Sequence, residues 1–174
     1  RLYNFVDNHD VDRIYDKLEN KKNLFPVYAF LFTTIGIPSI YYGSEWGIEG
    51  HKENGSDDGL RPAIDLRTFK APDPQLEAFI TKLAHIHARC PELSFGEQVE
   101  LLLTNRQYAY ARVYEGKACI TILNNDEQEA QLNLRLPFAG TSCRDLITGD
   151  AVDMENGSIF RTIGGNSAAV LRLE

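Results

Sequence analysis

Three aspartates and a histidine occupy positions 7 to 12, in the stretch FVDNHDVDR (residues 5–13). The charged residues directly follow a short apolar run, LYNFV (residues 2–6). Acidic side chains this close together repel one another or need partners that compensate their charge. We therefore expect the stretch to serve chemistry rather than simple solvation of a loop.

Two simpler roles and a metal site compete for these side chains. Asp7 and Asp12 are expected to be solvated loop residues or helix caps, because acidic residues are common at helix starts. A metal site of Asp7, His9 and Asp10 is possible by ligand type. However, adjacent residues point in different directions and no further cluster of ligands follows in the sequence, so we expect no metal and no cofactor.

Composition excludes several classes of partner. The 174 residues include 25 acidic and 18 basic side chains, which gives a formal charge of −7. No basic stripe is available to neutralise phosphates, so we expect no nucleic-acid partner. No apolar run approaches the length of a membrane span, which is roughly 18 residues, and no signal-peptide pattern opens the chain.

Three cysteines, Cys90, Cys119 and Cys143, are odd in number and widely spaced. They form no C-x-x-C pair and have no histidine at metal-ligand spacing. We expect buried, reduced thiols, which favours a reducing, cytoplasmic compartment.

Up to residue 92 the pattern alternates between strand and helix. We expect a strand at residues 2–6, a helix at 24–35 with Pro26 in its first turn, and a buried strand at 39–43. A long polar loop over residues 44–74 follows, and a loop of this length is typically functional or mobile. Apolar residues at helical spacing then predict a helix from residue 75 that Pro91 ends.

After residue 95 the period changes to alternation. Seven runs recur about every 8 to 14 residues between turn-forming residues: QVELLLT, YAYARVY, ACITILN, AQLNLRL, SCRDLI, SIFRTIG and SAAVLRLE. They predict a small antiparallel β-sandwich or Greek key. We therefore divide the chain into residues 1–92 and an all-β domain of residues 93–174.

Two β/α units cannot cover a parallel sheet or close a barrel, so residues 1–92 are expected to be the end of something larger. The chain also opens with Arg1 inside an expected strand, from which we expect an upstream portion to be missing. In a (β/α)8 TIM barrel the chemistry gathers in the loops after the strands. Both FVDNHDVDR and the loop after SIYYG hold this position.

Three motifs in order resemble the α-amylase family, glycoside hydrolase family thirteen: FVDNHD, GIPSIYYGSEWGIEG and GSDDGLRPAI. FVDNHD is similar to the family's fourth conserved region on the seventh barrel strand, and GIPSIYYGSEWG is similar to the eighth strand and its loop. The strand-rich end resembles the β-sandwich that follows the barrel. The resemblance implies the C-terminal part of a TIM barrel followed by that sandwich, an α+β fragment.

The resemblance also implies roles. Asp10 would be the family's third catalytic carboxylate, which binds hydroxyls of the sugar at the scissile bond of a starch-like α-glucan or maltooligosaccharide, and His9 would donate to the same sugar. The nucleophile and the acid/base would lie upstream of Arg1. We therefore expect the chain alone not to hydrolyse starch, and its partner to be the missing upstream barrel.

Several side chains keep two interpretations. Asp58 and Arg61 resemble a pair that grips a more distant glucose, but Arg61 could instead pin the loop by bonding carbonyls. Trp46 could stack on a sugar, whereas Tyr42 is expected to pack in the core. The alternative to an enzyme fragment is a binding or structural module, in which Tyr108, Tyr110 and Tyr114 form a glucan platform; packing of this face on the barrel is favoured. An incomplete barrel should also self-associate.

Overall fold

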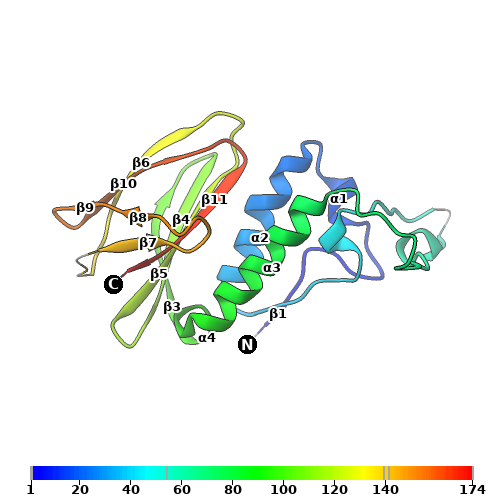
Figure 1. Cartoon of the computed structure of the whole chain (residues 1–174), viewed down its shortest axis with the longest axis horizontal. Coiled ribbons are helices and arrows are strands. Elements are labelled where there is room, and N and C mark those ends of the chain that lie inside the picture. Colours follow the sequence, from blue (N-terminus) through cyan, green and yellow to red (C-terminus); the bar gives the residue numbers. More distant parts are fainter. Residues whose placement is uncertain (1, 54, 139, 141, 174) are drawn as a thin grey trace.

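Helices and two short parallel strands form the chain up to residue 95, and antiparallel strands form the rest (Figure 1). The computed structural model describes residues 2–53, 55–138, 140 and 142–173. Within these residues, no helix is both long enough and apolar enough to cross a bilayer.

The first part places two strands side by side. β1 (Tyr3–Asn4) and β2 (Ile37–Pro38) pair in parallel, with Tyr3 opposite Ile37. The helical segments around them are α1 (Ile14–Lys17), η1 (Lys21–Asn23), α2 (Leu24–Thr33), η2 (Ser44–Trp46), η3 (Asp58–Leu60), α3 (Pro74–Arg89) and α4 (Pro91–Phe95). The order of parallel strands and intervening helices agrees with two β/α units.

The helix predicted from residue 75 is confirmed as α3. Its N-cap is Asp73, whose carboxylate accepts hydrogen bonds from the backbone N–H groups of Gln75 and Leu76. One face is buried, as the helical spacing predicted: Leu76, Ile80, Leu83 and Ile86. Cys90 is extended, and Pro91 begins the separate short helix α4.

The strand predicted at residues 39–43 is wrong. The parallel pairing lies earlier, at Ile37–Pro38, and the chain turns after it into η2. Gly43 takes a positive φ of 86°, which ends extended structure. The rings of Tyr41 and Tyr42 instead pack against the buried guanidinium of Arg13. The apolar residues of this stretch therefore do not indicate a β-strand.

Nine strands of the described chain follow residue 96. They are β3 (Glu97–Leu103), β4 (Gln107–Tyr114), β5 (Lys117–Asn124), β6 (Ala130–Arg135), β7 (Cys143–Asp145), β8 (Ala151–Val152), β9 (Met154–Glu155), β10 (Ser158–Ile163) and β11 (Ser167–Leu173). Each predicted run contains one strand, whereas the two-residue strands β8 and β9 were not predicted. One sheet has the order β3-β4-β5-β11-β7-β8 and the other β6-β10-β9, so the antiparallel sandwich is observed.

Two apolar clusters form the core. One lies between the two sheets, and the other joins α2 and α3 to the opposite face of the six-stranded sheet (Figure 1). Cys90 and Cys119 belong to the second cluster and Cys143 to the first, and all three are buried. The predicted buried thiols are confirmed.

The tyrosines of β4 pack toward the helices. Tyr110 is completely buried, and its hydroxyl lies 2.6 Å from the hydroxyl of Thr33 at the end of α2. Phe30 of α2 contacts the rings of both Tyr108 and Tyr110. The favoured interpretation, packing rather than a glucan platform, agrees with this geometry, and an exposed three-ring platform does not.

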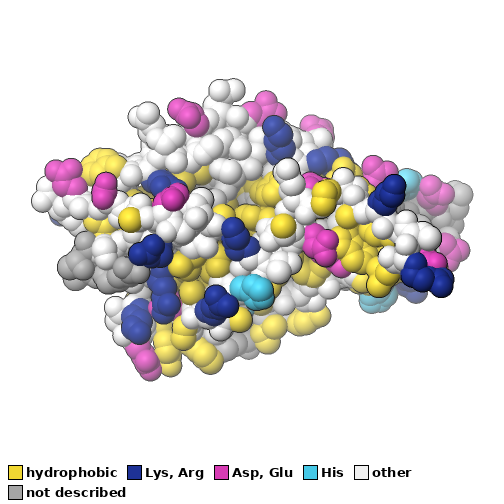
Figure 2. All heavy atoms as spheres, in the orientation of Figure 1, with side chains coloured by type: hydrophobic (Ala, Val, Ile, Leu, Met, Phe, Trp, Pro, Cys, Tyr) yellow, Lys and Arg dark blue, Asp and Glu magenta, His cyan; other side chains and the backbone are white. Residues whose placement is uncertain are grey.

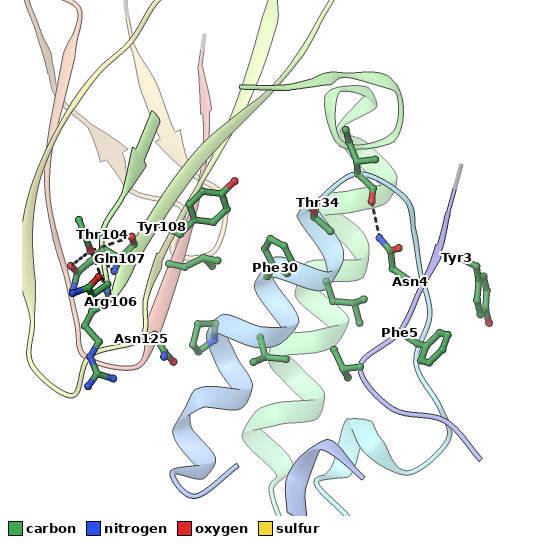
Figure 3. Close-up of a pocket in the computed structure, with 17 residues that line it drawn as sticks. Tyr3, Asn4, Phe5, Phe30, Thr34, Thr104, Arg106, Gln107, Tyr108 and Asn125 are labelled. Carbon is green, nitrogen blue, oxygen red and sulfur yellow. Dashed lines mark hydrogen bonds between the residues drawn. The ribbon is translucent and has the colours of Figure 1, made fainter. Parts of the chain in front are cut away.

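A groove runs between α2, β1 and the loops that join β3 to β4 and β5 to β6 (Figure 3). Asn4 points toward the helix side and donates a hydrogen bond to the carbonyl of Ile35. Tyr3 and Phe5 point away from α2 and are 66% and 47% exposed. The β1/β2 pair is therefore covered by helix on one face only.

Candidate functional site

Asp10 and His9 lie in a turn that follows β1 and is closed by the side chain of Asn8. The Asn8 carboxamide oxygen accepts hydrogen bonds from the backbone N–H groups of Asp10 (2.8 Å) and Val11 (3.2 Å). Such an Asx turn reverses the chain locally and leaves the intervening side chains outside. His9 and Asp10 are each 56% exposed at the side chain.

Donors flank the Asp10 carboxylate on both sides. One oxygen lies 3.1 Å from Nε2 of His9, and the other lies 3.2 Å from Nη2 of Arg61. Arg61 also donates from Nε to the backbone carbonyl of His9, at 3.2 Å. The structure thus brings together three of the predicted site residues, His9, Asp10 and Arg61. Arg61 donates to the backbone carbonyl of His9 and also pairs with the carboxylate of Asp10.

Asp57, rather than Asp58, forms the ion pair with Arg61. The Arg61 guanidinium lies 2.9 Å from Asp57, which also lies 2.9 Å from the ammonium group of Lys52. The hydrogen bond from Lys52 lowers the pKa of Asp57, and the same bond raises the pKa of Lys52. Binding of a glucose by Arg61 and the exposed Asp58 stays a prediction.

Charges alternate along this edge: Lys52, Asp57, Arg61, Asp10 and His9. Figure 2 shows acidic, basic and histidine side chains gathered at the end of the molecule that the long loop forms. Each carboxylate oxygen has two lone pairs, so Asp10 can accept from hydroxyl groups while it keeps its protein donors. The edge is suited to binding a neutral polyhydroxyl ligand.

Behind this edge, Asp7 is buried, with 1% exposure. Its carboxylate accepts from the Ser44 hydroxyl at 2.8 and 2.9 Å and from the backbone N–H of Ile14, the first residue of α1, at 2.9 Å. Asp7 is therefore not a solvated loop residue, and it is not the N-cap of α1 either, because that residue is Arg13. Asp12 does not cap α1, and it accepts from the backbone N–H of Lys52 in the long loop.

Tyr42 is not a core residue of a strand. It is 43% exposed, and its hydroxyl donates to the carbonyl of Pro62 at 3.0 Å. The expected core packing is wrong because the chain turns at this point instead of continuing a sheet. Trp46 packs on Phe69, with ring centroids 4.9 Å apart, so its indole is already engaged within the long loop.

Within the part of the chain that the structure describes, no three His, Cys, Asp or Glu side chains form a group suited to a metal ion. His51 contacts Asp16 and Glu53 at the base of the loop, away from Asp10's own partners.

Residues 100–169 match the family model described as Maltogenic Amylase, C-terminal domain. Over 93% of its length the chain is 31% identical to a cyclomaltodextrin glucanotransferase from Bacillus licheniformis. The chain belongs to the α-amylase family. The resemblance seen in the three motifs is thus confirmed, and the strand-rich part is a C-terminal domain of that family.

Solved α-amylase-family structures share the fold. An α-amylase from Geobacillus thermoleovorans, complexed with acarbose, superposes with a TM-score of 0.85 and 24% identity over 99% of this chain and 39% of that chain. CldA, a cyclomaltodextrin glucanotransferase with a three-domain ABC distribution, gives a TM-score of 0.82 and 25% identity over 100% of this chain and 37% of its own. The chain spans about a fifth of the length of the curated relatives that it matches.

Sequence reasoning missed Lys52, Asp57, Ser44 and Arg13. The four-residue spacing of Asp57 and Arg61 could have indicated their pairing, because residues at this spacing meet within a helical turn. Arg13 ends the quoted stretch, but its partners lie 29 to 47 residues away. No local pattern could have indicated them.

Proposed function

We propose that this chain forms one edge of the catalytic site of a longer glycoside hydrolase or transglycosylase that acts on α-glucans. The observation that carries this proposal is the Asp10 carboxylate, held between the imidazole of His9 and the guanidinium of Arg61. These groups come from the segments that follow two neighbouring parallel strands, β1 and β2. Loops after neighbouring parallel strands are where β/α enzymes place their chemistry.

Asp10 binds hydroxyl groups of the sugar at the scissile bond. As positive charge develops on the ring in the transition state, hydrogen bonds from these hydroxyls to a carboxylate strengthen, which favours the distorted, oxocarbenium-like geometry. His9 donates to the same sugar. Arg61 with Asp57, and the neighbouring Asp58, hold hydroxyls of a glucose further along the chain, since a planar guanidinium suits vicinal oxygens.

The groups that cleave the bond come from elsewhere in the longer protein. A retaining mechanism needs a nucleophile and an acid/base carboxylate about 5 Å apart. Glu45 and Glu49 follow β2 but do not match the family's motifs for these roles. We assign both groups to an upstream barrel of which β1 and β2 are the last two strands. The coverage of about a fifth of the curated relatives supports this assignment.

The experiment compares two purified proteins on maltooligosaccharides: the 174-residue chain and a longer polypeptide that carries it behind its own upstream sequence. We expect cleavage or transfer by the longer polypeptide and neither reaction by the chain alone. Cleavage by the chain, with contaminating amylase excluded, would contradict the division of catalytic groups. A folded longer polypeptide that acts on no α-glucan would contradict the function itself.

A further inference from the structure

Arg13 is a completely buried arginine directly behind the site. Its guanidinium donates to the carbonyl of Tyr42 at 2.7 Å, to the hydroxyl of Ser44 at 3.0 Å and to the carbonyl of Leu60 at 2.8 Å. The Tyr41 ring lies over it, 4.2 Å from the guanidinium carbon to the ring centroid. One side chain therefore joins the segment after β1 to two separate parts of the long loop.

The positive charge of Arg13 is compensated through a hydroxyl. Ser44 accepts a hydrogen bond from Arg13 and donates to the buried carboxylate of Asp7. A buried arginine and a buried aspartate are thus joined by one serine. Buried charges require such compensation, because an unpaired charge in the interior is strongly destabilising.

The same segment closes a loop of residues 50–60. The backbone N–H of Arg13 donates to the carbonyl of Gly50 at 2.8 Å, and the Asp16 carboxylate accepts from the N–H of Gly50 at 2.7 Å. At the other end of the loop, Arg13 holds Leu60. We call Gly50 and Gly59–Leu60 the loop neck.

The two glycines allow the loop neck to close. A Cβ atom at Gly50 would lie 2.6 Å from the carbonyl oxygen of Gly59, and one at Gly59 would lie 2.7 Å from the carbonyl oxygen of His51. Both contacts are to backbone atoms, so a side chain at either position would force the two backbone segments of the loop neck apart.

Arg61 directly follows Leu60, and Asp10 lies three residues before Arg13. We propose that Arg13 is a positioning residue: it holds the loop neck closed so that Arg61 bridges Asp10 and Asp57. This inference rests on the proposed function for its consequence, because the bridge forms the glucan-binding edge. The clamp itself rests only on the contacts of Arg13.

Lysine cannot replace Arg13 in this role. The guanidinium holds two carbonyls and a hydroxyl in fixed directions at once, whereas an ammonium group is a compact point charge on a flexible stem. Arg13→Lys therefore keeps the charge that Asp7 needs but loses the simultaneous grip on Tyr42 and Leu60. Gly59→Ala opens the loop neck without changing Arg13 at all.

The first measurement is hydrogen exchange of backbone amides on the 174-residue chain. We expect Arg13→Lys to accelerate exchange in residues 51–53 and 55–61 by about tenfold or more, while strands β4 and β5 keep their protection. Gly59→Ala should give the same local pattern, which tests the neck even if the arginine variant unfolds. The matched control is Arg67→Met, which removes an exposed arginine whose ion pair with Asp65 is local. Exchange of residues 51–53 and 55–61 that is equal in Gly59→Ala and the control would overturn the clamp.

The second measurement uses the longer polypeptide on maltooligosaccharides. A displaced loop would lose sugar contacts that are made equally in the bound substrate and in the transition state. We therefore expect Arg13→Lys and Gly59→Ala to raise KM about tenfold with kcat nearly unchanged. Accelerated exchange with an unchanged KM would overturn the positioning role, although the clamp would stand. A longer polypeptide inactive on all α-glucans would refute the proposed function instead, and the exchange result would still decide the clamp.

Discussion

The carboxylate of Asp10 and the guanidinium of Arg61 lie 3.2 Å apart although 51 residues separate them in the sequence. Both side chains are about half exposed, at 56% and 46%. An exposed ion pair contributes only about 0–1 kcal/mol to stability, so this contact does not hold the loop in place. The buried groups behind it must do so.

Ser44→Ala should show how much those buried groups contribute. The substitution removes the hydroxyl that joins Arg13 to Asp7 and leaves both with an unsatisfied buried group. We expect a loss of about 1–3 kcal/mol in the free energy of unfolding, measured by urea denaturation. Ser56→Ala is the control, because Ser56 lies in the exposed part of the loop and its hydroxyl accepts from the nearby N–H of Asp58. Equal stability of the two variants would contradict the account.

Tyr110 should matter for stability and not for sugar binding. Tyr110→Phe removes the hydroxyl that bonds Thr33, with an expected net loss of about 0.5–1.5 kcal/mol. Tyr110→Ala should cost about 3–5 kcal/mol, because it leaves a cavity between the sheet and α2. Isothermal titration with maltoheptaose checks the other interpretation. Binding by the chain that disappears in folded Tyr110→Phe would restore the platform.

The Lys52–Asp57 pair predicts a pH dependence. The pKa of Asp57 is lowered, so its stabilising contribution is present above the ordinary aspartate pKa of about 3.9 and is lost as pH falls through the lowered value. The pKa of Lys52 is raised, so its contribution is present below about 10.4 and is lost as pH rises through the raised value. The pair is therefore intact between these limits and breaks in acid.

Carbon-13 NMR of the Asp57 carboxyl group can check this. We expect its titration midpoint to lie below that of an aspartate in a model peptide and to rise in Lys52→Met, because the hydrogen bond from Lys52 is lost. Lys70→Met is the control, since Lys70 is exposed and outside this pair. The same midpoint with and without Lys52 would disprove the assigned cause.

Self-association is expected from the uncovered face of the β1/β2 pair. Tyr3 and Ile37 are adjacent in register and are 66% and 50% exposed. Figure 2 shows hydrophobic side chains along the edge of the molecule near the N-terminus. We expect the sedimentation coefficient to rise with concentration and Ile37→Lys to suppress that rise, because burying a lysine is costly.

Leu103→Lys serves as the control for this effect. Leu103 is 65% exposed, but it lies on β3 of the six-stranded sheet and not in the β1/β2 pair. Its replacement should leave the concentration dependence unchanged. A wild-type chain that sediments as a clean monomer at the highest concentration would refute the prediction.

Much of the fold could be predicted because its signals are local. The helical spacing of Leu76, Ile80 and Leu83 gave α3, and alternation gave the longer strands of the sandwich. Strands β8 and β9 have two residues each, which is too short for a period to show. The apolar run SIYYG misled because its tyrosines pack around Arg13, a partner from another segment.

The site was predictable in part for the same reason. Asp10, His9 and Arg61 were found through motifs that lie within short stretches of sequence. The compensation of Asp7 by Ser44 and the grip of Arg13 on Leu60 depend on contacts over 37 and 47 residues. Only the fold brings these groups together, so the residues that hold the site were the ones that were missed.

The most direct measurement is the turnover number of Asp10→Asn in the longer polypeptide on a maltooligosaccharide, with circular dichroism to confirm the fold. Asparagine keeps the size of the side chain but loses the charge that stabilises a positive sugar ring. We expect kcat to fall by about 10²–10³ or more, while Asp65→Asn, an exposed carboxylate on the same loop, stays near wild type. Turnover of Asp10→Asn within about tenfold of wild type would contradict the assignment of Asp10 to the transition state.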